Sequence, residues 1–121
     1  MEIQISEILD RLSILLIKVE EIGQPADKEF IAYASELLLK SNVDFNVAIP
    51  AIRKLYEINK KLWDVEYETS NAKNISDKQM SKAAKDVRIY NNQRVKFRNE
   101  VAKKLGGFVD IKKGYYDFDK K

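Results

Sequence analysis

The sequence predicts an all-α protein, an elongated helical bundle, and three observations predict it. Apolar residues recur at the three-to-four-residue spacing of a helix along most of the 121 residues. The chain has only 4 Gly and 2 Pro to interrupt such helices, so a turn-rich β-sandwich is not expected. Alternation typical of a strand occurs only near the end, at Val109 and Ile111. The length is that of one domain, and with 45% hydrophobic residues the chain can bury a core.

The first two helices are expected over residues 6–22 and 25–41. Ser6 is predicted as the N-cap of the first helix and Gly23 as its end. The apolar residues of this helix fall on two faces, which is typical of a helix held between neighbours, so we expect it to be central. Pro25 suits the first turn of the second helix.

The third and fourth helices are expected over residues 47–70 and 77–105. Pro50 is predicted to lie in the first turn of the third helix, since further inside it would break the hydrogen-bond ladder. Ser76 and Gln79 form a capping box, which is the clearest start signal in the chain.

The fourth helix determines the expected shape. Its 29 residues would be about 44 Å long, whereas a compact domain of this size is roughly 35 Å across. We therefore expect the third and fourth helices to form a long antiparallel hairpin that overhangs the rest. The overhanging apolar stripe would be covered by a second copy, which predicts a homodimer. The helical domain would span residues 1–106, followed by a C-terminal tail at 107–121.

Polar residues at apolar positions of the predicted helices are the candidates for a site. They come from three helices: Glu7, Asp10 and Lys18 from the first, Asn59, Trp63 and Glu66 from the third, and Asn91 and Arg94 from the fourth. Because an unpaired buried charge is costly, we expect Arg94 to pair with Glu66 or Asp10. Asn59 and Asn91 would fill the remaining hydrogen bonds.

This predicted network has two interpretations. It fixes the register of the helices, or it forms a ligand pocket between them. In the second interpretation Arg94 and Lys18 would bind an anion, and Trp63 would form an apolar wall. The acidic residues of the set would orient the two cations.

Three segments carry a resemblance to a known family. They are S-E-I-L-D-R-L-S-I-L-L-I-K at 6–18, N-K-K-L-W-D-V-E at 59–66, and 91–115, which runs from N-N-Q-R through L-G-G to K-G-Y. Together they resemble a family of small bacterial proteins known only as a domain of unknown function. Its segments are approximately G-E-L-x-D-K-I-T-I-L-x-I-K, N-x-x-L-W-D-I-E-D and N-D-x-R ending in E-K-S-Y. The resemblance implies a shared fold and a shared site that adds Lys113 and Tyr115 to the candidates, and it implies no reaction.

The composition excludes much enzyme chemistry. The chain has no Cys and no His, which removes disulfides, thiolate sites, and the commonest general base and metal ligand. We expect no catalytic residue, metal or cofactor. The enzyme alternative is a metal-dependent nucleotide hydrolase of the all-α type, which needs two Glu-x-x-Glu/Asp pairs for Mg²⁺. Glu7 and Asp10 form one such pair, Asp64 and Glu68 are only an i,i+4 pair, and the second motif is missing.

Charge is unevenly distributed along the chain. Residues 1–76 have nine basic and thirteen acidic residues, a balance of −4, and residues 77–121 have thirteen and six, a balance of +7. Attraction between these halves, within the hairpin or across a dimer, explains the distribution, so we do not expect a nucleic-acid partner. The nucleic-acid alternative would use phosphate contacts along the fourth helix and base stacking by the tail. Its residues are Lys82, Lys85, Arg88, Lys96, Lys103, Lys104, Tyr115, Tyr116 and Phe118.

No stretch of the chain approaches the roughly 20 apolar residues of a membrane span. The N-terminus lacks the basic and apolar regions of a secretory signal. We therefore expect a cytoplasmic helical binding or assembly protein, with a partner protein or a small anionic ligand and no membrane partner.

Overall fold

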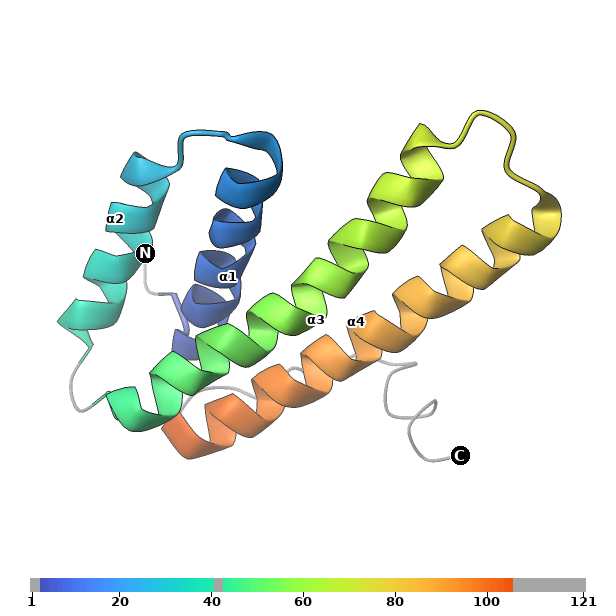
Figure 1. The fold of residues 1–121 in the computed structure, drawn as a ribbon. Helices are drawn as coiled ribbons and strands as arrows, with labels where there is room; N and C mark the ends of the chain where they lie inside the picture. Colours follow the sequence, from blue (N-terminus) through green and yellow to red (C-terminus); the bar gives the residue numbers. More distant parts are fainter. Residues whose placement is uncertain (1–2, 41–42, 106–121) are drawn as a thin grey trace.

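The structure, a computed structural model, describes residues 3–40 and 43–105. These residues form α1 (Ile5–Ile22), α2 (Asp27–Leu39), α3 (Phe45–Asn71) and α4 (Asp77–Leu105), and they contain no strand (Figure 1). The predicted all-α fold is confirmed. None of these helices is both long and apolar enough to cross a membrane. The predicted tail at 107–121 lies outside the described residues.

The helix α1 lies at the centre of the bundle. It packs against α2 on one side and against α3 and α4 on the other, as its two apolar faces predict. The helices α3 and α4 run antiparallel beside each other (Figure 1). The shorter α1–α2 hairpin lies beside one half of the α3–α4 hairpin, and the other half extends beyond it. The elongated shape predicted from the helix lengths is confirmed.

The core lies where α1 meets the first half of α3 and the end of α4. Its buried cluster takes apolar side chains from all four helices: Ile8, Leu9, Leu12, Leu37, Ala48, Ala51, Leu55 and Val101. Burying a side chain as large as Leu or Ile stabilises the fold by about 1.5–3 kcal/mol. Leu37 is the one residue of α2 that is buried, so α2 is the helix least anchored in this core.

The first helix begins and ends through its backbone. Ile5 is its first residue, and Gln4 precedes it without a side-chain capping bond. The prediction that Ser6 caps the helix is wrong, because Ser6 lies inside the first turn and is buried. Gly23 ends the helix as predicted. Its backbone is left-handed, with φ 59°, and its N–H donates to the carbonyl of Val19 at 3.1 Å.

The two prolines lie at different helix positions from those predicted. Pro25 precedes α2, which spans Asp27–Leu39 rather than residues 25–41. Pro50 lies in the second turn of α3, since this helix begins two residues earlier than expected. The predicted first-turn position of Pro50 is therefore wrong. The earlier start is stabilised by Asp44, whose carboxylate accepts a hydrogen bond at 3.0 Å from a first-turn backbone N–H.

The last helix begins with the predicted capping box. The backbone N–H of Ser76 donates to Oε1 of Gln79 at 3.0 Å, and the N–H of Gln79 donates to Oγ of Ser76 at 3.1 Å. The helix then runs for 29 residues to Leu105, as predicted. The glycines predicted to end it, Gly106 and Gly107, lie outside the described residues.

The overhanging half of the α3–α4 hairpin is mostly polar. Its large exposed apolar residues are Tyr67 and Met80, and the first ten residues of α4 contain few apolar side chains to form a stripe. Most of the large exposed apolar side chains lie on α1, on α2 and at the start of α3. The uncovered apolar surface that the sequence places on the overhang is therefore found mainly at the other end of the molecule.

We predict that Gly23→Ala lowers the free energy of unfolding by about 1 kcal/mol. A Cβ at this position meets nothing within 4 Å, so the cost comes from the left-handed backbone alone. Urea unfolding followed by circular dichroism measures the change. Gly23→Asn is the control, and it should lose less because Asn tolerates this conformation better. Equal stability of G23A and the wild type would contradict this role of Gly23.

Candidate functional site

Asp10 is the central residue of a buried polar cluster. It lies in the second turn of α1, and 2% of its side chain is exposed. Arg94 of α4 binds it through two nitrogens. Nε donates to Oδ1 at 3.2 Å and to Oδ2 at 3.0 Å, and Nη2 donates to Oδ2 at 2.5 Å. A charge-assisted pair with two donors is the strong form of an arginine–carboxylate contact.

Asn59 brings α3 into the same cluster. Its Nδ2 donates to Oδ1 of Asp10 at 2.8 Å and to Oγ of Ser13 at 3.0 Å. The Ser13 hydroxyl in turn donates to the backbone carbonyl of Asp10 at 2.6 Å, which leaves its oxygen free to accept from Asn59. Hydrogen bonds therefore join α1, α3 and α4 around one carboxylate.

Arg98 adds a second guanidinium to this group. It lies one turn after Arg94, and its Nη1 is 3.8 Å from Oδ2 of Asp10, too far for a hydrogen bond. Its Nε is buried and has no hydrogen-bond partner among residues 3–40 and 43–105. Two guanidinium groups thus face one carboxylate, which gives a formal charge of +1. We call Asp10, Ser13, Asn59, Arg94 and Arg98 the Asp10 cluster.

Charge matching explains how this cluster is held. A buried carboxylate without donors is costly, and both oxygens of Asp10 accept from protein donors. Arg94 and Arg98 keep 28% and 22% of their side chains exposed, so water still reaches part of each guanidinium. The cluster therefore fixes the level at which the three helices meet.

The predicted pairing of Arg94 with an acid is confirmed, and the acid is Asp10. Glu66 is exposed and is not its partner. The last turn of α1 meets α3 at Lys60, whose Nζ is 2.8 Å from Oε1 of Glu21. Glu66 lies six residues further along α3, about 9 Å, and is therefore past the end of α1.

The two predicted asparagines differ in their contacts. Asn59 is buried and hydrogen-bonded in the cluster, as predicted. Asn91 is half-buried and makes none of the hydrogen bonds of the Asp10 cluster, so that part of the prediction is wrong. The position expected for a second amide is taken by the Ser13 hydroxyl.

Sequence reasoning does not select Ser13 and Arg98 as candidates. Each still has a spacing signal, since Ser13 lies three residues after Asp10 and Arg98 lies four residues after Arg94. Residues three or four apart share a helix face, so extending each polar position by one turn would find both.

Glu7 takes part in a separate, exposed contact between α1 and α2. Its Oε1 accepts from Nη2 of Arg11 at 2.7 Å, and Nη1 of Arg11 donates to the hydroxyl of Tyr33 at 2.5 Å. These bonds, first that to Tyr33 and then that to Glu7, raise the pKa of Arg11. Glu7 therefore pairs with Arg11 and not with a cation of the Asp10 cluster.

Neither Lys18 nor Trp63 takes part in the hydrogen bonds and ion pairs of the Asp10 cluster. Lys18 is half-buried on α1, eight residues after Asp10, which is about 12 Å along the helix. Trp63 is half-buried on α3. Lys113 and Tyr115 lie outside the described residues. The ligand-binding roles given to all these residues stay predictions.

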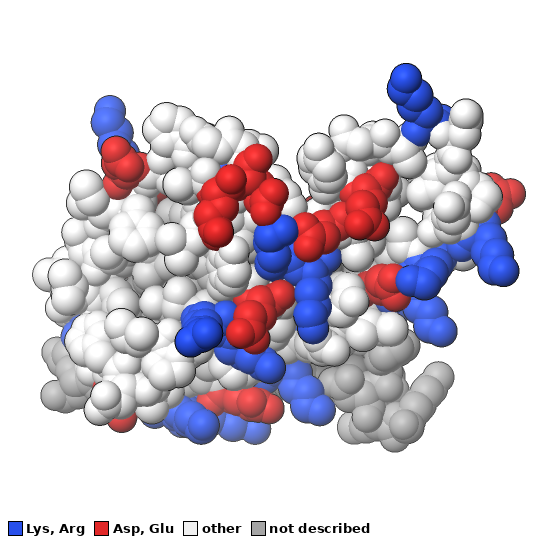
Figure 2. Space-filling view, viewed as in Figure 1, with Lys and Arg blue, Asp and Glu red and all other residues white. Residues whose placement is uncertain are grey.

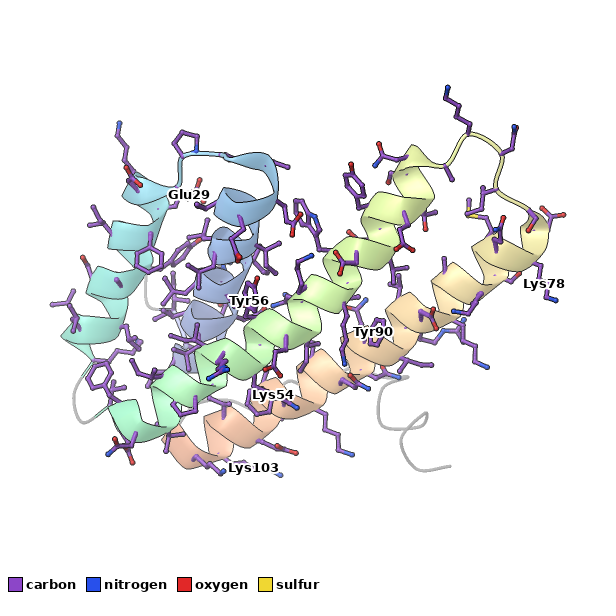
Figure 3. All side chains as sticks on the ribbon, in the orientation of Figure 1. Glu29, Lys54, Tyr56, Lys78, Tyr90 and Lys103 are labelled. Atoms are coloured by element: carbon purple, nitrogen blue, oxygen red, sulfur yellow. The ribbon has the colours of Figure 1, made fainter. Side chains whose placement is uncertain are left out.

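A second polar contact joins the end of α1 to the middle of α3. Nζ of Lys60 is 2.8 Å from Glu21 and 2.6 Å from Asp64, and these carboxylates, Asp64 first, raise the pKa of Lys60. A hydrogen bond with Glu20 raises the pKa of Tyr56, which lies between the two helices (Figure 3). Figure 2 shows a notch at the top of the molecule, with acidic side chains on both sides of it and basic side chains between them. The acidic and basic side chains here pair with one another, and these pairs hold α1 against α3.

No group of three or more acidic side chains converges on a metal-sized site in the part of the chain that the structure describes. Three of the four carboxylates considered for a metal-dependent hydrolase pair with cations in this structure: Glu7 with Arg11, Asp10 with Arg94, and Asp64 with Lys60.

The described residues of α3 and α4 line open grooves between the two helices. One, of about 350 Å³, lies near the start of α3, with Phe97 and Val101 among its lining and Lys54 and Lys104 at its sides (Figure 3 labels Lys54). Another, of about 290 Å³, lies beside the α3–α4 loop and includes Ile75. Neither includes a residue of the Asp10 cluster in its lining.

Exposed apolar side chains gather on α2 and the start of α3. We call this surface the α2 face, and its exposed apolar residues are Phe30, Ile31, Leu38, Leu39, Phe45 and Ile49. In Figure 2 much of the surface at the left carries no charge, apart from the charged side chains at the upper left, where α2 begins. Sequence reasoning does not find this face, because periodicity identifies an apolar side of a helix without showing how much of it a neighbour covers.

Comparison with protein-family models, curated proteins and solved structures gives no match for this chain. The resemblance to the bacterial family of unknown function stays a prediction. Function is therefore inferred from the geometry of the chain itself.

We predict that Asp10→Leu alone lowers the free energy of unfolding by about 3 kcal/mol, because it leaves a partly buried guanidinium without its carboxylate. The double variant Asp10→Leu/Arg94→Met should recover most of this loss, since apolar side chains of similar size can replace such a pair. Urea unfolding of both variants, of Arg94→Met and of the wild type measures the coupling. Additive losses in the double variant would contradict the pairing.

Proposed function

We propose that this chain is a binding and assembly protein that acts in the cytoplasm and binds another protein chain through the α2 face. One observation carries the proposal: Ile31 and Leu38 lie on one line of α2 and are 64% and 72% exposed. Contiguous apolar patches larger than a few hundred Å² are rare on soluble monomers and mark protein-binding surfaces. The cysteine-free composition suits a reducing compartment.

The Asp10 cluster supports this proposal by having a structural role. It joins α1, α3 and α4 and uses both carboxylate oxygens within the chain. The helix α2 takes no part in it. The cluster therefore joins three helices, and most of the uncovered apolar residues of the α2 face lie on the fourth, α2.

The absence of cysteine allows one position to be labelled at a time. We predict that, in cells producing Ser35→Cys, a membrane-permeant maleimide labels residue 35 several-fold more slowly than it does in the dilute purified protein. The reason is that a bound protein covers the α2 face in the cell. Ser81→Cys, at an exposed position of α4, is the matched control and should be labelled equally fast in both. Equal labelling of both variants in both settings would overturn the proposal.

We infer a second candidate function, the binding of a small anion beside Arg98. The observation that favours it is the buried Nε of Arg98, which has no hydrogen-bond partner among the described residues, in a cluster with a formal charge of +1. A phosphate, sulfate or carboxylate group would accept a charge-assisted hydrogen bond there. Because Nε itself is buried, such a ligand would reach the guanidinium through the 22% of the Arg98 side chain that is exposed.

If this candidate is correct, phosphate or sulfate raises the Tm of the wild type at constant ionic strength. Arg98→Gln removes the guanidinium and should remove the rise. Chloride at the same ionic strength controls for screening of surface charges. An equal rise in the wild type and R98Q would show that the anion acts elsewhere.

A further inference from the structure

We propose that the partner on the α2 face is a second copy of this chain, and that the two α2 helices pair antiparallel across a two-fold axis near Ala34 and Ser35. This inference rests on the proposed function of the α2 face and names its partner. It follows from three features of α2: how little of it is buried, the order of its exposed side chains, and the position of its charges.

The helix α2 is covered on one side only. Leu37 is its one buried residue, and among the other helices α1 supplies its main packing contacts. Ile31 and Leu38 are seven residues apart, so they lie about 20° from the same line on the helix, at 100° per residue. Leu37 lies about 100° away from Leu38 around the helix. The line through Ile31 and Leu38 is thus a second apolar strip beside the buried one.

The order of residues along this strip is the same in both directions. A large exposed apolar residue lies at each end, Ile31 at one and Leu38 at the other, while Phe30 and Leu39 flank the strip on opposite sides of the helix. The small residues Ala34 and Ser35 lie midway between them. A two-fold interface requires a surface that is complementary to itself. Reversing the strip places Ile31 against Leu38 of the partner subunit, and the small residues at the centre let the helix axes approach to about 8 Å.

The charges of α2 favour the antiparallel arrangement. Asp27 lies at the start of the strip, one turn before Ile31, and Glu36 lies on the opposite side of the helix. A parallel pair would bring the two Asp27 carboxylates together. In the antiparallel pair they are separated by about 15 residues of helix, or roughly 22 Å, which removes most of their repulsion at physiological salt.

A disulfide across the axis tests this pairing. In the proposed pair the two residues at position 35 lie beside the axis, within the roughly 4.4–6.8 Å between Cα atoms that a disulfide needs. Under mild oxidation, Ser35→Cys should form a linked dimer on a non-reducing gel at concentrations where Ser81→Cys stays unlinked. Both are Ser-to-Cys changes at exposed positions, and the chain has no other cysteine.

A charge placed on the strip tests the same contact without a disulfide. Leu38→Arg should raise the Kd of the dimer at least about tenfold in sedimentation equilibrium. Met80→Arg, a matched change at an exposed apolar residue of the overhang, should leave the Kd unchanged. Because Leu38 is 72% and Met80 48% exposed, circular dichroism should show both variants folded like the wild type.

The outcomes separate this inference from the proposed function. A dimer that links through residue 35 and weakens in L38R supports both. A dimer that links no better through residue 35 than through residue 81 overturns the α2 pairing. A monomer at all concentrations whose residue 35 is still protected in cells overturns the second copy and leaves another protein as the cover. A monomer without protection overturns both.

Discussion

The structure depends on the pairing of one buried carboxylate with donors from two other helices. Because Asp10 is buried and charged, α3 and α4 must bring Asn59 and Arg94 to its level on α1. This level also positions the apolar core, since Ile8 and Leu9 precede Asp10 directly and are fully buried. The helix α1 has 18 residues, whereas α3 and α4 have 27 and 29, so an overhang is unavoidable once the three are joined here.

Most of the fold could be predicted because its signals act within a few residues. The capping box at Ser76 and the left-handed Gly23 need only their own turns, and both are found as predicted. The errors at Ser6 and Pro50 have a different origin. Packing buries Ser6 inside the helix, and the Asp44 cap moves the start of α3 upstream of the expected first turn. In both cases a neighbouring contact overrides a local preference.

The site could be predicted only in part, because periodicity gives the face of a residue and not the residue opposite it. Asp10 and Glu66 are equivalent partners for Arg94 by sequence. The length of α1 and its contact with Lys60 decide between them in three dimensions. The chemistry is harder still to predict, because a buried polar cluster looks the same in sequence whether its charges are matched within the chain or by a ligand. Here Asp10 is matched within the chain, and Arg98 is matched less completely.

The helix α2 connects the fold to the proposed assembly. A helix of 13 residues is marginal on its own in water, and this one buries a single residue. Its hydrogen bond from Arg11 to Tyr33 adds a contact to α1 but covers none of the outer strip. Burying that strip against a second copy would stabilise α2, so the stability of α2 would depend on dimer formation. The Asp10 cluster does not involve α2. Assembly can therefore change how stably α2 is folded while α1, α3 and α4 stay joined.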